Sequence, residues 1–146
     1  MKIREMRNHI LVLLGLFLFQ SCLIINFWDK KTPKENFDVG EQKLNEGDDI
    51  NAIVYFTKAI KQDPQYLEAY GERAKVFLKS DSFNLAIQDY SKIIELKPSG
   101  EAYFLRANAY WGSASGRDSL ACKDWETAKN LNHNRSWDMI RLHCKK

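Results

Sequence analysis

The sequence repeats itself with a period of about 34 residues, and this periodicity limits the fold more than any other feature. Pro64 and Pro98 are 34 residues apart, as are Ala52 and Ala86. A fixed period of roughly 20–50 residues is typical of repeat proteins, in which one small structural unit is stacked several times. Three copies are phased by small, aromatic and proline residues at Val39, Gly40, Ala52, Phe56, Ala59, Pro64; Tyr70, Ala74, Phe77, Ala86, Tyr90, Ile93, Pro98; and Tyr103, Ala107, Tyr110, Ala121, Trp125, Ala128.

The residue types within each copy indicate a pair of packed helices. Small residues at Gly40, Ala74 and Ala107 allow a first helix to approach the second closely, and aromatic residues later in each copy can fill the space between successive pairs. A proline after the second helix ends it, because proline cannot continue the helical hydrogen-bond ladder. One pair alone leaves an apolar face exposed, so the pairs must stack to bury a core.

This pattern resembles the tetratricopeptide repeat family. The resemblance implies an all-α fold, a right-handed α-solenoid of three helix-turn-helix repeats plus a C-terminal capping helix, spanning residues 37–146. The first copy is degenerate, with Asn36 and Lys43 at aromatic positions, and His133 replaces the third proline. The expected helices are 35–46, 49–62, 65–79, 82–96, 99–111, 117–131 and, as the cap, 135–144.

The resemblance also implies a concave groove, lined by the first helix of each pair, that binds a protein or peptide. When the repeats are aligned with the family pattern, the residues at the groove-lining positions are Phe37, Glu41, Leu44, Glu68, Gly71, Lys75, Leu78, Glu101, Phe104, Asn108 and Trp111. We expect Phe104 and Trp111 to be the anchors, since aromatic residues dominate interface energies; alternatively they pack beneath the cap against Trp137. The lysine and asparagine pattern that clamps a terminal carboxylate in some family members is absent, and the three glutamates favour a neutral or mildly basic segment.

The amino-terminal segment indicates export. Lys2, Arg4 and Arg7 precede an apolar run at residues 10–19, which is typical of a secretory signal. With Cys22 directly after it, the segment resembles a bacterial lipoprotein signal, which implies acylation of Cys22. Residues 1–21 would then be the signal and residues 22–36 the acylation site and tether. The alternative is an uncleaved anchor over residues 10–28. Both place the repeats outside the cytoplasm, at a bacterial cell envelope.

Cys122 and Cys144 are candidates for a disulfide. Each lies 11 residues from His133, so an antiparallel hairpin turning near His133 brings the two thiols to the same level. Disulfides persist in oxidising compartments; the alternative is two separate thiols. A metal site formed by Cys122, Cys144, His133 and His143 is disfavoured, and so is a nucleophile formed by Cys144 and His143. The reason is that His143 and Cys144 are adjacent, and adjacent residues on a helix point about 100° apart.

Charge and motifs exclude several other functions. The net charge is +3, and without residues 1–21 the chain has 19 basic and 18 acidic side chains, too balanced for nucleic-acid binding. There is no glycine-rich phosphate loop, zinc-protease motif or haem-attachment pair. The sequence therefore predicts a non-enzymatic adaptor without cofactor, metal or small-molecule substrate. The alternative is a structural subunit of an envelope complex that uses its convex face or cap.

Overall fold

The computed structural model describes residues 31–113 and 118–144, so the predicted signal and Cys22 lie outside the described residues. By contacts the chain divides into Met1–Lys31 and Thr32–Lys146, and all described helices belong to the second unit. The described residues contain helices and no strands. The helices are α2 (Pro33–Asn45), α3 (Asp49–Gln62), α4 (Leu67–Lys79), α5 (Phe83–Leu96), α6 (Gly100–Gly112), α7 (Asp118–Asn130) and α8 (Ser136–His143).

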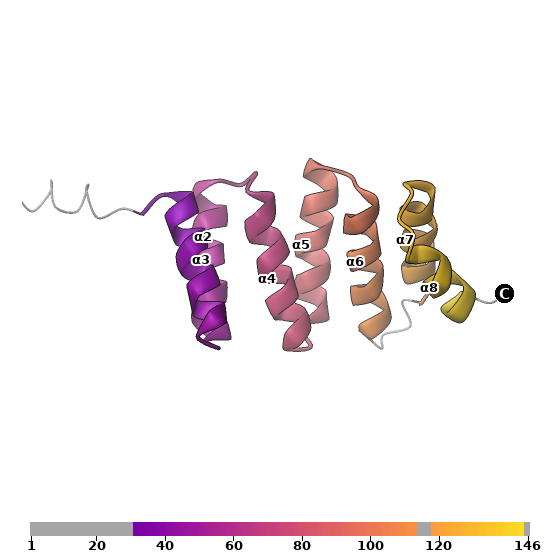
Figure 1. Cartoon of the computed structure of the whole chain (residues 1–146), viewed down its shortest axis with the longest axis horizontal. Coiled ribbons are helices and arrows are strands. Elements are labelled where there is room, and N and C mark those ends of the chain that lie inside the picture. The colour runs from indigo at the N-terminus through magenta and orange to yellow at the C-terminus, as the bar shows by residue number, and fades with distance from the viewer. Residues whose placement is uncertain (1–30, 114–117, 145–146) are drawn as a thin grey trace, which may run out of the picture. The chain divides into compact units, whose positions relative to one another are not determined.

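These helices follow one another in space as they do along the chain (Figure 1). The main packing partner of every helix is its neighbour in sequence, from α2 against α3 to α7 against α8. Pairs α2–α3, α4–α5 and α6–α7 are the three helix-turn-helix repeats, and α8 is the terminal helix. The all-α solenoid class predicted from the repeat is confirmed, and the helix bounds agree with the sequence within about two residues.

The alanines and aromatics of the repeat pattern form the core. Ala52, Ala86 and Ala121 are fully buried, as are the rings of Phe56 and Trp125. At Gly40 a Cβ atom would lie 2.6 Å from Cε1 of Phe56, so only glycine allows α2 to approach α3 this closely. The predicted roles of the small and aromatic positions are therefore confirmed in the packing.

The amino terminus of α2 includes residues 33–36, which are the last residues of the predicted tether at 22–36. The helix starts at Pro33 because Thr32 and Glu35 form a capping box, in which each side chain accepts a hydrogen bond from the other residue's backbone N–H. Proline suits the first helical position, where its missing N–H would have no partner. Asn36 is buried and its amide donates to Oε1 of Gln62 at 2.9 Å, so it belongs to the repeat and not to a linker.

Two arginines, Arg73 and Arg106, each form an ion pair within a repeat and a hydrogen bond to the preceding repeat, and the apolar pattern does not reveal these contacts. Arg73 on α4 donates to both carboxylate oxygens of Asp89 on α5, at 2.8 and 2.6 Å, and to Thr57 Oγ1 on the preceding α3 at 2.9 Å. Arg73 thus contacts the second helix of its own repeat and the second helix of the repeat before it. The equivalent contacts one repeat later run from Arg106 to Asp124 at 2.7 and 2.9 Å and to Ser91 Oγ at 3.1 Å.

Candidate protein-binding face

The predicted groove residues lie on α2, α4 and α6, the first helices of the three repeats, and we call their exposed side the first-helix face. The structure gives these residues three degrees of burial. One, Phe104, is buried. The exposed members are Glu41, Glu68, Lys75, Glu101 and Trp111, and the half-buried members are Phe37, Leu44, Gly71, Leu78 and Asn108.

On α2 the apolar members of this face are held by aromatic packing. The ring of Phe37 lies 5.5 Å from that of Phe56 and 5.2 Å from that of Tyr66, centroid to centroid, in tilted arrangements. Leu44 packs against the core formed around Ala52 and Phe56. Phe37 and Leu44 are thus fixed in place while part of each remains accessible.

On α4 the face combines charge with open space. Lys75 is exposed and its ammonium lies 2.6 Å from Oε1 of Glu72. A Cβ atom built on Gly71 would meet only Cδ1 of Ile93, at 3.9 Å, which is an ordinary contact distance. The expectation that Gly71 leaves room in the middle of the face agrees with this geometry.

Phe104 on α6 is covered by the chain's own carboxyl-terminal segment and is not exposed as an anchor. Its side chain is 5% exposed, because the segment that follows α7 folds over it. The ring of His133 lies 4.3 Å from the ring of Phe104, and the guanidinium of Arg135 lies 4.8 Å from it. The same two residues contact Glu101, with His133 Nε2 at 2.8 Å and Arg135 Nη2 at 3.6 Å from its carboxylate.

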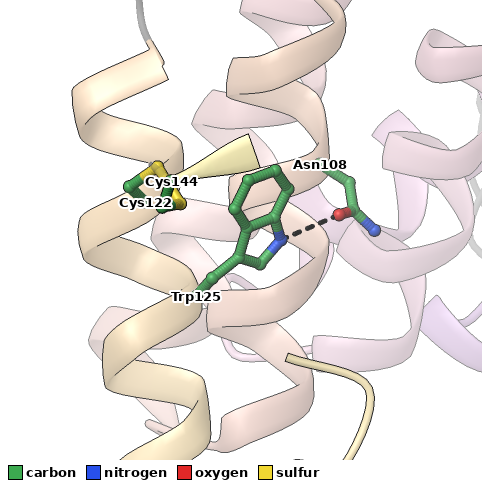
Figure 2. The surroundings of a disulfide bond; sticks show 4 residues. All are labelled: Asn108, Cys122, Trp125 and Cys144. Carbon is green, nitrogen blue, oxygen red and sulfur yellow. Dashed lines mark hydrogen bonds between the residues drawn. A yellow bond between two sulfur atoms is a disulfide. The ribbon is translucent and has the colours of Figure 1, made fainter. Parts of the chain in front are cut away.

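Trp111 and Asn108, the remaining predicted residues of α6, also have partners within the chain. Trp111 is 47% exposed, and its ring lies 4.6 Å from that of His143 at the end of α8. Asn108 Oδ1 accepts a hydrogen bond from the indole N–H of Trp125 at 3.0 Å (Figure 2). Trp137, which the sequence offered as a packing partner, is instead 63% exposed, with the ammonium of Lys129 4.4 Å above its ring.

Cys122 on α7 and Cys144 after α8 form a disulfide, with 5.6 Å between their Cα atoms (Figure 2). The pair closes a separation of 22 residues around the turn at His133. Among residues 31–113 and 118–144, no group of three or more His, Cys, Asp or Glu side chains could hold a metal ion. None of the helices described is both long and apolar enough to cross a bilayer.

The buried Tyr90 and the half-buried Arg106 have perturbed pKa values. Burial raises the pKa of the Tyr90 hydroxyl to about 12, since its ring is 1% exposed. The hydrogen bond to the Asp124 carboxylate raises the pKa of Arg106 above its ordinary value, which keeps the guanidinium charged in the network between repeats. Both effects stabilise one protonation state of the folded core, and neither group is placed to act on a ligand.

Comparison with known proteins identifies the repeat. Residues 67–99, which include α4 and α5, match the tetratricopeptide repeat model. Human sperm-associated antigen 1 is 36% identical over 72 residues, which is 49% of this chain and 8% of that protein. The chain spans at most 20% of the length of the first curated relatives that it matches.

Solved structures share the arrangement of the helices. The first TPR of Spaghetti (RPAP3), bound to the HSP90 peptide SRMEEVD, superimposes with a TM-score of 0.68 at 23% identity, covering 80% of this chain and 93% of that one. The TPR2B domain of yeast Sti1, in its complex with pHsp70, gives a TM-score of 0.64 at 26% identity and covers 76% and 92%. The repeat match and these superpositions agree on the fold and on the repeat unit.

Proposed function

We propose that this tetratricopeptide repeat chain is a non-catalytic protein-interaction module that binds an extended protein segment along α2 and α4 at a bacterial cell envelope. One observation carries the proposal. On these two helices, exposed charged side chains at Glu41, Glu68 and Lys75 alternate with half-buried apolar ones at Phe37 and Leu78. Accessible apolar surface beside charge is what a segment with mixed side chains needs for affinity and register.

The structural neighbours support peptide binding and differ from this chain in charge. The titles of the two solved structures name an HSP90 peptide, SRMEEVD, and pHsp70 as what is bound. That HSP90 peptide contains three acidic residues near its end. Here the face of α2 and α4 presents the exposed carboxylates of Glu41 and Glu68. Because like charges repel, we expect the segment bound by this chain to be neutral or mildly basic.

The envelope location rests on the amino-terminal sequence, whose residues lie outside the described part of the chain. Basic residues, an apolar run and Cys22 support export and acylation of that cysteine. Two lipid chains would hold the protein at a membrane through their buried methylene groups. Metabolic labelling with a fatty-acid analogue tests this: label should enter the natural chain and be lost in Cys22→Ala, whereas label retained by Cys22→Ala would disprove acylation there.

Site-specific photocrosslinking tests the binding face. A photoreactive amino acid placed at Lys75 on α4 should crosslink a protein in the native cells, because Lys75 is exposed on the first-helix face. The matched control is Lys61, an exposed lysine on the second helix α3. Crosslinking at position 61 without crosslinking at position 75 would reject the first-helix face as the binding surface.

That reversed result would instead support a structural subunit that uses a surface of second helices. One observation favours this second candidate: Ile50 and Val54 on α3 are 78% and 42% exposed. Crosslinking at position 75 with none at 61 would count against it.

A further inference from the structure

The carboxyl-terminal segment, residues 131–144, covers the part of the first-helix face that belongs to α6. Its contacts extend from the start of α6 to its end. At the start of α6, His133 and Arg135 contact Glu101, and one turn later the same two residues cover Phe104. At the far end the ring of His143 lies 4.6 Å from that of Trp111, in a tilted contact. The chain therefore occupies with its own residues the surface that α2 and α4 leave accessible in the preceding repeats.

Apart from the disulfide, this segment is held by modest contacts. Helix α8 has only 8 residues, and isolated helices shorter than about 12–15 residues are marginal in water. Met139 and Ile140 are half-buried against the core around Trp125, and Ser136 is buried beside His133. The polar contacts to Glu101 lie on a carboxylate that is 54% exposed, where charge pairs stabilise little.

The disulfide fixes the far end of the segment. Cys144 directly follows His143, the residue whose ring contacts Trp111, and it is bonded to Cys122 on α7. Both cysteine residues are half-buried rather than fully buried. While the bond is intact, α8 can lift only as part of a closed loop.

We propose that the disulfide is a redox-sensitive latch, and that its reduction releases the carboxyl-terminal segment and opens the α6 part of the first-helix face. A dithiol supplies the two electrons. Its thiolate attacks one sulfur of the pair, forming a mixed disulfide and expelling the other cysteine as a thiolate. Its second thiol then displaces the first cysteine, which leaves an oxidised dithiol and, after protonation, two cysteine thiols. The role of the opened surface as a binding site rests on the proposed function, whereas the opening itself does not.

The size of the effect follows from the loop that the bond closes. For a separation of 22 residues, the chain-entropy model gives a change of about three hundredfold in the equilibrium for opening. The half-buried side chains of α8 remain after reduction, so the segment should exchange between closed and open states rather than unfold the array.

Amide hydrogen exchange and hydroxyl-radical labelling on the full chain test the latch. Adding dithiothreitol should speed exchange in residues 136–143 by about three hundredfold and raise radical labelling of Phe104 several-fold. Phe56, fully buried between α2 and α3, should label equally in both states. The variant Cys122→Ser with Cys144→Ser should behave like the reduced chain and should not respond to dithiothreitol.

Two results would overturn the latch. One is unchanged exchange in α8 after complete reduction, and the other is faster exchange in α8 without new labelling of Phe104. Neither readout needs a partner, so the absence of crosslinks at position 75 would refute the proposed binding face and leave this test unaffected.

Discussion

Two glycines on first helices provide a direct test of the packing argument. Gly40 in α2 and Gly71 in α4 each lie inside a 13-residue helix. Alanine in place of a helical glycine stabilises a helix by roughly 0.5–1 kcal/mol, because glycine loses more backbone freedom on folding. Gly71→Ala should show this gain, since the new methyl would meet only Cδ1 of Ile93 at 3.9 Å.

Gly40→Ala should behave in the opposite way. Its Cβ would lie 2.6 and 2.8 Å from two ring carbons of Phe56, and that ring is fully buried and packed against Phe37. Overpacking of this kind costs about 1–3 kcal/mol. Because the helix-propensity gain is common to both variants, it cancels in the comparison, and Gly40→Ala should be less stable than Gly71→Ala by about 1–3 kcal/mol.

Guanidinium denaturation followed by circular dichroism at 222 nm measures the difference in free energy of unfolding. Near the melting temperature, each kcal/mol of this difference corresponds to a shift in melting temperature of about 4 °C in a domain of this size. Equal stability of the two variants, or a more stable Gly40→Ala, would refute the claim that only glycine fits between α2 and α3.

Three further substitutions test the core. Tyr90→Phe removes a buried hydroxyl that has no hydrogen-bond partner in the described structure, so it should not destabilise the protein at pH 7. Because the pKa of Tyr90 in the folded state is raised to about 12, the natural chain should lose stability relative to this variant between pH 10 and 12 and not below. Parallel profiles of stability against pH for the two proteins would contradict this. Asp124→Ala leaves Arg106 half-buried without its carboxylate and should lower the free energy of unfolding by about 2–4 kcal/mol; a loss no larger than in an exposed control, Glu126→Ala, would show that the network contributes little. Phe104→Ala should cost about 3–5 kcal/mol as a cavity in the core, and unchanged thermal stability would restore Phe104 as a free surface anchor.

The sequence predicted the repeat architecture well because periodic burial determines it. Ala52, Phe56 and Ala59 recur with the period of the fold, and each has the burial that its position in the pattern requires. The helix bounds follow from the same periodicity, together with prolines and turn residues such as Gly47, whose φ is +79°. Helix α2 starts two residues before the expected position 35, and the capping box at Thr32 and Glu35 is the local signal that places its start.

The candidate site was predicted less well, because phase assigns a residue to a helix face but does not show what else covers that face. Phe104 has the same phase as Phe37 and Gly71, yet the segment after α7 buries it. The Arg73–Asp89 pair was also missed, since its members are 16 residues apart and belong to no apolar pattern. The pairing of Cys122 with Cys144 was anticipated only because both lie equally far from the turn.

The affinity of the crosslinked partner for two charge-reversal variants tests the binding face most directly. Glu68→Lys reverses an exposed charge on the first helix α4, and Glu126→Lys reverses one on the second helix α7. If a neutral or basic segment binds along α2 and α4, Glu68→Lys should weaken binding about tenfold, or roughly 1.4 kcal/mol, with Glu126→Lys unchanged. Equal affinities for the two variants, or weakening by Glu126→Lys alone, would contradict a binding site on the first-helix face.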